Sequence, residues 1–438
     1  MATEALISSL SALQFSECYA LVKYGLAATD PDTMHKTLKT VAKEGSPRHT
    51  RDMCYYLLNK TSRSFARVIQ ELDSELRHPV CIFYLVLRGL DTIEDDMTIP
   101  LEKKLDVLAN FHKSLYQRGW KFTENGPDEK DRELCAKFDI VIEEFLNMKE
   151  EYQTIIADIA KRMAAGMAEF RSDKKVITLD DYNLYTHYVA GLVGLGLTGL
   201  FAASGLESPS LANQTVLANH MGLFLQKVNI MKDFKEDWDE GRWFWPQEIW
   251  KDYVPAGGDL GEFTRPENLD RGLACLNHLC ADALDLVPDC LEYLSLLQNQ
   301  TVFQFAAIPQ VMAIASIALF FNNAVIFQRA GLKIRRGLAV KLILGCNSFD
   351  SVKDIYRGYI KDLTLANDIR VGSNPYDKSF LRVGQALSKA TQWLQRHDLA
   401  YASKSVSKTS SSWADMFLTI LVLVVAVLLA FSFIPRAQ

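Results

Sequence analysis

The stretch Cys81–Asp96, CIFYLVLRGLDTIEDD, is a mainly apolar segment that ends in a cluster of acidic residues. Its apolar residues return at three- and four-residue spacing, which predicts a buried helix. In the acidic cluster, Asp91 and Asp95 are four residues apart, so on a helix both carboxylates lie on one face, about 40° apart around the axis. The stretch therefore predicts a helix that carries paired carboxylates out of a protein core.

The same arrangement returns about 140 residues later, where the apolar stretch Met221–Met231 precedes Asp233 and Asp237. Placing four like charges in one apolar helical protein is unfavourable unless a cation joins them. Mg²⁺ suits such a place, because it binds carboxylates together with substrate phosphates. The two pairs therefore predict a metal clamp for a diphosphate. A solvated helix end is the alternative for either cluster alone, and the apolar flanks argue against it.

Helical periodicity extends over most of the chain and predicts an all-α fold. Alternating strand patterns bounded by hairpin turns are hard to find, so a βαβ architecture is excluded. We expect an N-terminal segment at 1–45 and one large helical catalytic domain at 46–393. The expected helices are Asp52–Asp73, His78–Asp96, Leu101–Arg118, Arg132–Phe170, Asp180–Ala203, Ser210–Trp238, Asn268–Leu297, Thr301–Gln328, Arg335–Gly345 and Ser348–Asn367.

The C-terminal end predicts a membrane anchor. Met416–Ile434 is 19 residues long and contains no charged residue, close to the roughly 20 residues that a helix needs to cross a bilayer. We expect a polar linker at 394–413 and a transmembrane helix at 414–434. A second apolar stretch, Thr301–Phe321, contains a proline and polar residues, so we expect it to line the protein interior. The N-terminus lacks the features of a signal peptide, so we expect the catalytic domain to face the cytosol.

Composition excludes several other classes of protein. The net charge is −5 and there is no long basic run, which argues against nucleic-acid binding. The eight cysteines form no CxxC pair and several lie in apolar helical stretches. They therefore indicate reduced core residues rather than a zinc site or a disulfide framework.

The stretch Gly194–Gly199, GLGLTG, matches the GxGxxG fingerprint of dinucleotide-binding turns. That fingerprint must follow a strand and precede an acidic residue about 20 positions on. Here it lies inside an expected helix, and Glu207 follows too soon. We expect these glycines to let helices, or a long ligand, approach the backbone closely.

Basic and aromatic residues accompany the acidic pairs. On a helix, Tyr84 and Arg88 share the face of the first pair. Arg63 lies between serines, and Arg242 follows the second pair closely. Arginine grips phosphate oxygens in a bidentate manner. A surface ion pair is the alternative for each arginine alone, and their convergence on two acidic pairs favours an anionic, metal-bridged ligand.

Several long motifs resemble the squalene synthases (farnesyl-diphosphate farnesyltransferases). The resemblance covers nearly the whole chain from about Met34 to about Ile360, together with the C-terminal anchor. Each acidic motif alone is also similar to those of other class I isoprenoid synthases, phytoene synthases in particular. The motifs are DTIEDD from Asp91, DFKED from Asp233, GRWFWPQEIW from Gly241, SRSF from Ser62, HYVAGLVGLGL from His187 and AAIPQVMAIA from Ala306.

The resemblance implies an all-helical class I isoprenoid synthase fold with a central channel. Two farnesyl diphosphates would condense there head-to-head to presqualene diphosphate, which NADPH would reduce to squalene. The metal would be Mg²⁺, with Mn²⁺ as a substitute. We further expect a monomeric catalytic domain on the cytosolic face of the endoplasmic reticulum, since an apolar product can leave directly into the bilayer.

The resemblance also implies roles for individual residues. Tyr185 matches the tyrosine of proton transfer in the first half-reaction, and Phe305 occupies a position near the second, where water must be excluded. The implied metal ligands are Asp91, Glu94, Asp95, Asp233 and Asp237. The implied diphosphate contacts are Arg63, Ser64, Tyr84, Arg88 and Arg242. The implied NADPH contacts are Lys333, Arg335, Arg336 and Asn229.

Two alternatives remain at this point. A phytoene-synthase-like prenyl transferase would lack the reductive step, and with it the basic NADPH segment and usually the C-terminal anchor. A tail-anchored helical scaffold would need an apolar interaction face and no metal-dependent turnover, and the paired aspartates count against it.

Overall fold

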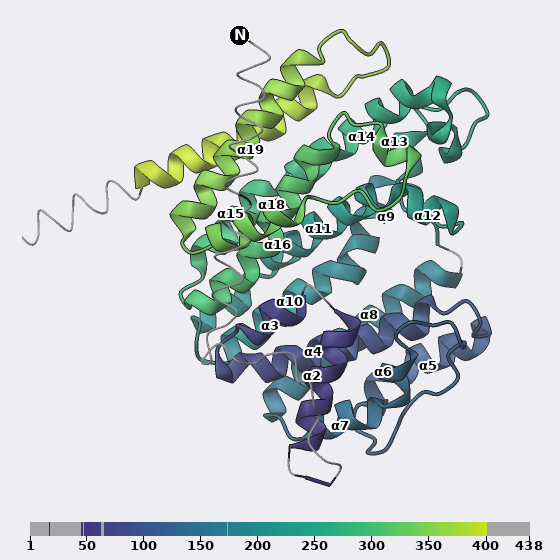
Figure 1. Cartoon of the computed structure of the whole chain (residues 1–438), viewed down its shortest axis with the longest axis vertical. Helices are drawn as coiled ribbons and strands as arrows, with labels where there is room; N and C mark the ends of the chain where they lie inside the picture. Colours follow the sequence, from purple (N-terminus) through teal and green to yellow (C-terminus); the bar gives the residue numbers. More distant parts are fainter. Residues whose placement is uncertain (1–16, 18–44, 47, 63–64, 173, 401–438) are drawn as a thin grey trace, which may run out of the picture. The chain divides into compact units, whose positions relative to one another are not determined.

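The computed structural model describes residues 17, 45–46, 48–62, 65–172 and 174–400 (Figure 1). Throughout these residues the secondary structure is helical and no strand is assigned, so the predicted all-α fold is confirmed. The predicted membrane anchor at 414–434 lies outside the described residues. The first compact unit of the chain ends at Leu387, and a second begins at Ser388.

The first unit consists of helices and the segments that join them, and a further helix covers 380–400. Their bounds are α2 (His49–Thr61), α3 (Phe65–Gln70), α4 (Ser74–Asp95), α5 (Leu101–Ser114), α6 (Arg132–Ala136), α7 (Phe138–Leu146), α8 (Glu150–Ser172), α9 (Leu179–Thr186), the π-helix η2 (His187–Gly191), α10 (Leu192–Ala203), η3 (Pro209–Asn213), α11 (Thr215–Lys232), α12 (Phe234–Asp239), α13 (Gln247–Trp250), η4 (Leu260–Thr264), η5 (Pro266–Asn268), α14 (Leu269–Leu284), α15 (Val287–Leu296), α16 (Gln300–Phe320), α17 (Val325–Gln328), α18 (Arg336–Gly345) and α19 (Phe349–Ile369).

One long expected helix, Arg132–Phe170, is divided into α6, α7 and α8. The side-chain amide of Gln153 donates hydrogen bonds to the carbonyl oxygens of Leu146 (3.3 Å) and Met148 (2.9 Å). These bonds satisfy backbone acceptors that the end of α7 leaves open. Apolar periodicity continues across this break and does not register it.

Four further expected helices are also interrupted. Asn268–Leu297 is divided into α14 and α15, and Thr301–Gln328 is divided into α16 and α17. Asp52–Asp73 ends at Thr61 and resumes as α3, and Ser210–Trp238 begins as a 3₁₀ turn and breaks at Asp233. Asp233, with φ −93° and ψ 11°, is both the C-cap of α11 and the N-cap of α12. The bend therefore falls at the first carboxylate of the second acidic motif.

Helix α10 is a spacer between α4 and α11, and glycines set its distance to each. A Cβ atom on Gly194 would lie 2.2 Å from the carbonyl oxygen of Ala218 in α11, and one on Gly196 would lie 2.4 Å from the ring of Phe83 in α4. From the other side, a Cβ on Gly222 would lie 2.2 Å from the carbonyl oxygen of Ala190. The prediction of close helix approach is confirmed for Gly194 and Gly196, and the GxGxxG stretch is helical rather than a nucleotide-binding turn.

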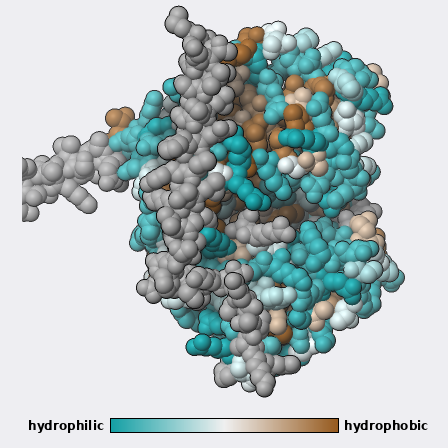
Figure 2. Space-filling model, in the orientation of Figure 1, coloured by the Kyte–Doolittle hydropathy of each residue, from teal (hydrophilic) through white to brown (hydrophobic). Residues whose placement is uncertain are grey.

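Helix α16 packs against α11, α15, α18 and α19, as predicted for an apolar helix of the interior. Of the described residues, two segments are long and apolar enough to cross a membrane, Leu179–Ala203 and Gln300–Phe320. Both belong to the helical bundle, and 61% of the most apolar part of α16 is buried within it. On the face that Figure 2 shows, hydrophilic residues cover most of the described surface.

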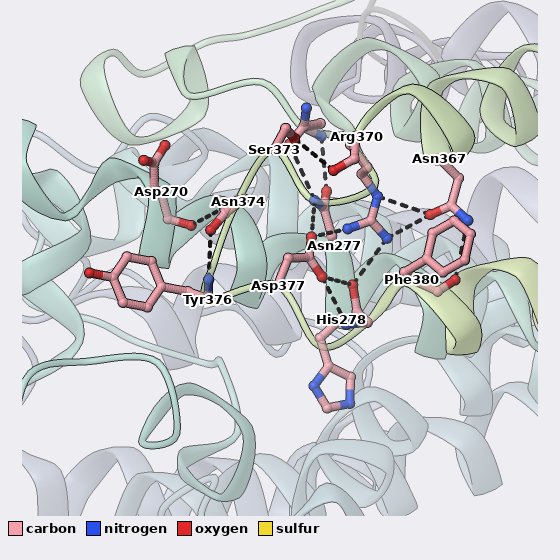
Figure 3. A network of polar contacts seen from close by, with 12 residues as sticks. Asp270, Asn277, His278, Asn367, Arg370, Ser373, Asn374, Tyr376, Asp377 and Phe380 are labelled. Atoms are coloured by element: carbon pink, nitrogen blue, oxygen red, sulfur yellow. Dashed lines mark hydrogen bonds and ion pairs between the residues drawn. The ribbon is translucent and has the colours of Figure 1, made fainter.

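A buried polar network fixes the segment that follows α19 (Figure 3). Arg370, which is 5% exposed, forms an ion pair with Asp377 and donates to Asn367 Oδ1 (2.6 Å) and Ser379 Oγ (3.2 Å). Asn277 of α14 donates to the same Asp377 carboxylate (3.0 Å). A buried ion pair is tolerated where further hydrogen bonds satisfy both partners, as here. The network therefore ties this segment to α14.

We predict that Gly222→Ala lowers the free energy of unfolding by at least about 2 kcal/mol, because the added Cβ meets the backbone of η2 rather than a movable side chain. Gly199→Ala is the matched control in α10, where the new Cβ would lie 3.3 Å from a methyl group of Ile155. Its change should stay within about 1 kcal/mol, since alanine favours the helix. Urea unfolding followed by circular dichroism measures both. Equal losses would contradict the role given to the close backbone approach.

Candidate functional site

The two acidic motifs lie at the C-terminal ends of apolar helices. Helix α4 begins at its N-cap Asp73, whose carboxylate accepts a hydrogen bond from the Glu75 amide, and it ends at the first motif. Helix α11 ends at Asp233, and the short α12 carries Asp237. The C-terminus of a helix has a partial negative charge, which disfavours carboxylates there. The first motif and Asp233 are therefore placed where a cation is needed, whereas Asp237 lies in the first turn of α12.

One cavity of about 260 Å³ brings the two motifs together, although they are far apart in the sequence. Its polar wall contains carboxylates of both motifs, and its apolar wall contains aromatic and aliphatic side chains. The lining residues are Asp91, Glu94, Asp95, Met167, Phe170, Tyr185, Val189, Gln226, Asn229, Ile230, Asp233, Asp237, Arg242 and Phe244.

Arg242 joins the two motifs electrostatically. Its guanidinium lies 3.2 Å from Asp237 Oδ1 and 2.6 Å from Glu240 Oε2, and 3.9 Å from Asp95 Oδ1 of the first motif. Gly241, with a φ of 73°, turns the chain directly after α12 so that Arg242 reaches this position. A left-handed glycine at the end of a helix is the usual way to make this turn.

Arg88 and Tyr84 accompany the first motif, as the helical spacing predicted. Arg88 Nε donates to the Tyr84 hydroxyl at 3.4 Å, and its NH1 atom lies 3.9 Å from Asp91 Oδ2. The Tyr84 hydroxyl donates in turn to the carbonyl oxygen of Thr61 (3.4 Å). The shared face is thereby confirmed. Arg63 and Ser64, predicted to contact the same anion, lie outside the described residues.

The carboxylates of the cavity are poorly stabilised as anions. Burial raises the pKa of Asp91 to about 7, although Arg88 opposes the shift. Burial likewise raises the pKa of Asp237 to about 6, against the opposing charge of Arg242. Burial raises the pKa of Asp233 too, while Lys232 and Lys333 lower it. Such shifts mark acidic groups that a bound cation would stabilise.

The donor set fits Mg²⁺. Asp91 Oδ1 is buried without a hydrogen-bond partner among the described residues, so it has a lone pair to offer a cation. In the part of the chain that the structure describes, no three His, Cys, Asp or Glu residues form a ready-made metal cage. Mg²⁺ does not need one, because it is held by one or two carboxylates, water and substrate phosphates.

Tyr185 faces the acidic side of the cavity from α9. Its ring stacks on Phe244, with centroids 4.8 Å apart and an angle of 11° between the planes, and meets the edge of Phe170 at 5.2 Å. Burial raises the pKa of the Tyr185 phenol, and the nearby carboxylates raise it further. The hydroxyl therefore stays protonated beside the two motifs.

Of the other predicted residues, some line this cavity and some do not. Asn229 lines it, whereas Phe305 is buried in α16 against Phe201, with ring centroids 6.0 Å apart, and is not among its lining residues. Arg335 forms an ion pair with Glu17, with NH2 at 2.6 Å from Oε1. The charge of Lys333, in the predicted basic segment, acts on Asp233 of the second motif and opposes the rise in its pKa.

Sequence reasoning missed part of the lining. Gln226 lies three residues before Asn229 and seven before Asp233, so helical spacing from the known aspartate could have found it. Phe244 lies within GRWFWPQEIW, but nothing in that stretch indicates which of its aromatic rings meets Tyr185. Met167 and Phe170 come from α8, and no local pattern relates that helix to the acidic motifs.

Comparisons with known proteins give a consistent result. Residues 58–324 match the squalene/phytoene synthase family. A squalene synthase of Schizosaccharomyces pombe is 46% identical over 376 residues, covering 82% of this chain and 79% of the relative. The Homo sapiens squalene synthase is 49% identical over 354 residues, covering 79% and 80%. The solved complex of TcSQS with the ligand E5700 superposes with a TM-score of 0.75 at 42% identity, covering 80% of this chain and 99% of that one.

We predict that Asp91→Asn stabilises the metal-free protein at pH 8. The raised pKa of about 7 means that the folded state binds this proton more tightly than the unfolded state, whose value is near 3.8. Stability therefore falls as the pH rises from about 4 to about 7, and the asparagine variant escapes that loss. We expect a gain on the order of 2–4 kcal/mol at pH 8 that disappears near pH 4.

Urea unfolding in the presence of a chelator, at pH values from 4 to 8, measures this difference. Asp158→Asn is the control, because that carboxylate is 56% exposed and pairs with Arg162 on the surface of α8. Its stability should follow the wild type at every pH. A gain for Asp91→Asn that is the same at pH 4 and pH 8 would contradict the assigned titration.

Proposed function

Since this chain belongs to the squalene/phytoene synthase family and has squalene synthase function, we propose that its acidic cavity binds two farnesyl diphosphates. They condense head-to-head to presqualene diphosphate, and NADPH then reduces this intermediate to squalene. The observation that carries the proposal is the meeting of both acidic motifs with Arg242 in one cavity of about 260 Å³. The relatives named squalene synthase in the comparisons support it.

Each acidic motif holds the diphosphate of one substrate through Mg²⁺, for which Mn²⁺ can substitute. Asp91, Glu94 and Asp95 are the ligands on α4, and Asp233 and Asp237 those on α11 and α12. Bound Mg²⁺ supplies positive charge to the departing diphosphate. Arg88 and Arg242 donate hydrogen bonds to its oxygens, together with Tyr84, Arg63 and Ser64.

The first half-reaction forms carbon–carbon bonds between the two prenyl chains and breaks one carbon–oxygen bond. Two farnesyl diphosphates yield one presqualene diphosphate, one free diphosphate and one proton. Tyr185 lies between the aromatic wall and the carboxylates, where the proton must leave. Because its phenol stays protonated, the hydroxyl acts as a relay. It accepts the proton from carbon and passes its own to the departing diphosphate.

The second half-reaction breaks the remaining carbon–oxygen bond and adds a hydride, which NADPH supplies. Lys333, Arg335 and Arg336 bind the phosphates of NADPH, with Asn229 as a further contact. Because Arg335 is paired with Glu17, a phosphate must share or displace that carboxylate. Phe305 lies in the apolar interior against Phe201, where it excludes water from the carbocation.

We assign the predicted catalytic domain, 46–393, to the cytosolic face of the endoplasmic reticulum as a monomer. The linker 394–413 and the helix 414–434 tether it to the bilayer, into which the apolar product can pass directly. The phytoene-synthase-like alternative would stop at presqualene diphosphate or a desaturated product. No feature of the cavity favours it over the reductive pathway.

We predict that the protein forms squalene from farnesyl diphosphate only when Mg²⁺ and NADPH are both present. Without NADPH it should accumulate presqualene diphosphate, because the first half-reaction needs no reductant. Product analysis by chromatography and mass spectrometry distinguishes these outcomes. A condensed product that never responds to NADPH would favour the phytoene-type reaction, and no product from folded protein would contradict the proposal altogether.

We predict that Arg336→Ala separates the two half-reactions. Removing one arginine–phosphate contact costs about 1.5–3 kcal/mol, so half-maximal squalene formation should need at least about tenfold more NADPH. Presqualene diphosphate formation should change less than about threefold. Arg329→Ala is the matched control, because it removes a nearby exposed arginine outside the basic segment. An equal loss of both half-reactions in Arg336→Ala would contradict the assignment.

A further inference from the structure

Asp96, the last residue of the first acidic motif, is bound differently from the aspartates that line the cavity. It is 4% exposed, and its carboxylate accepts four hydrogen bonds. Oδ1 accepts from the Thr98 amide (2.9 Å) and hydroxyl (2.6 Å). Oδ2 accepts from Asn125 Nδ2 (3.0 Å) and the Gly126 amide (2.8 Å). Asp96 therefore joins the end of α4 to the segment between α5 and α6.

Other contacts hold the same junction. Asn125 Nδ2 also lies 3.4 Å from the carbonyl oxygen of Thr92, and Lys104 of α5, which is 2% exposed, donates to the carbonyl oxygen of Glu94 (2.5 Å). Carbonyl groups in the last turn of a helix have no partner within that helix. Here the partners come from α5 and from the segment that Asp96 holds. The end of α4 that carries Asp91 and Asp95 is thereby fixed from outside.

The held segment forms the wall of a second cavity, of about 620 Å³, on which Arg88, Asp95 and Arg242 also border. Asp128, Glu129, Lys130 and Asp131 are its contribution to this wall. Asp131 is 6% exposed. Asp131 and Arg88 both line this cavity, and the positive charge of Arg88 opposes the rise in pKa that burial gives the Asp131 carboxyl. Arg88 thus has two acidic neighbours, Asp91 from its own helix and Asp131 from the held segment.

The position of Asp131 beside this cavity affects whether Asp91 is available to bind a cation. The contact between Arg88 and Asp91 is long, with NH1 at 3.9 Å from Oδ2, and Asp91 Oδ1 has no hydrogen-bond partner among the described residues. If Asp131 moved away, Arg88 would lose one of its two counter-charges and would be drawn toward Asp91. A closer ion pair would occupy the carboxylate that a cation needs, and would turn the guanidinium away from an incoming anion.

We propose that Asp96 is a positioning residue: by holding Asn125 and Gly126 it fixes Asp131 beside Arg88, and so keeps Arg88 oriented toward a diphosphate and Asp91 free for a cation. The inference rests on the proposed function, because it concerns how the same cavity receives a metal-bound diphosphate. In this proposal Asp96 itself contacts neither the cation nor the diphosphate.

The test compares the two aspartates that hold opposite ends of α4. Asp96→Ala should weaken the binding of inorganic diphosphate in the presence of Mg²⁺ by at least about tenfold, measured by calorimetry on the full chain in detergent. KM for farnesyl diphosphate should rise by a similar factor while kcat changes less than about threefold. Asp73→Ala removes only the cap at the other end, and diphosphate binding should stay as in the wild type.

Hydrogen exchange supplies a second readout. Peptides covering 119–131 should exchange faster in Asp96→Ala and unchanged in Asp73→Ala. Two milder variants guard against a failure of Asp96→Ala to fold. Asn125→Ala removes one donor, and Gly126→Ala adds a Cβ that would lie 2.8 Å from the Thr98 hydroxyl. Both should show weaker diphosphate binding together with faster exchange.

Asp131→Asn tests the charge of Asp131 apart from the position of its segment, because it removes the charge and leaves the hydrogen bonds of Asp96 in place. It should weaken diphosphate binding as Asp96→Ala does, while exchange of the segment stays close to the wild type. Faster exchange in the Asp96 and Gly126 variants with unchanged diphosphate affinity would overturn the inference and leave the proposed function standing. A wild-type protein that neither binds diphosphate nor forms product would instead overturn the proposed function.

Discussion

The repulsion among carboxylates at the C-terminal ends of two apolar helices is the constraint on which the site depends. Burial disfavours these anions and raises the pKa values of Asp91 and Asp237 to about 7 and about 6. Arg242 offsets part of this repulsion by lying within 4 Å of both motifs. A metal-bound diphosphate can offset the rest. Binding of the metal ions therefore also relieves the repulsion among the carboxylates.

Such an arrangement needs helices that cannot move apart. Helix α10 separates α4 from α11, and its glycines bring it into direct contact with both, through Phe83 on one side and Ala218 on the other. Each contact is too close to admit even a methyl group, so the spacing is set by backbone and ring surfaces rather than by adaptable side chains. The stripe that resembles a nucleotide-binding turn thus serves to hold two acid-bearing helices at a fixed separation.

The sequence was sufficient for features that depend on local spacing. The pairing of Asp91 with Asp95 on α4, and the shared face of Tyr84 and Arg88, follow from helix geometry, and the structure has them. It was insufficient where side chains from distant segments decide the outcome. The cap that Gln153 makes divides a continuous apolar pattern, and the contact of Tyr185 with Phe244 joins segments that no periodicity relates. Phe305, implied by resemblance alone, lies outside the acidic cavity.

Within the first motif, two aspartates have pKa values that are shifted in opposite directions. Asp91 and Asp96 are five positions apart on the chain; Asp96 is buried, and Asp91 is partly buried. Asp96 accepts hydrogen bonds from Thr98, Asn125 and Gly126, which bring its pKa to about 2 even though burial opposes them. Asp91 has no comparable donors, and burial takes its pKa to about 7. The hydrogen-bond donors around each side chain therefore decide its role. Asp96 holds the backbone, and Asp91 remains able to bind a cation. The sequence of the motif alone does not predict which aspartate has which role, because Asn125 and Gly126 come from the segment between α5 and α6.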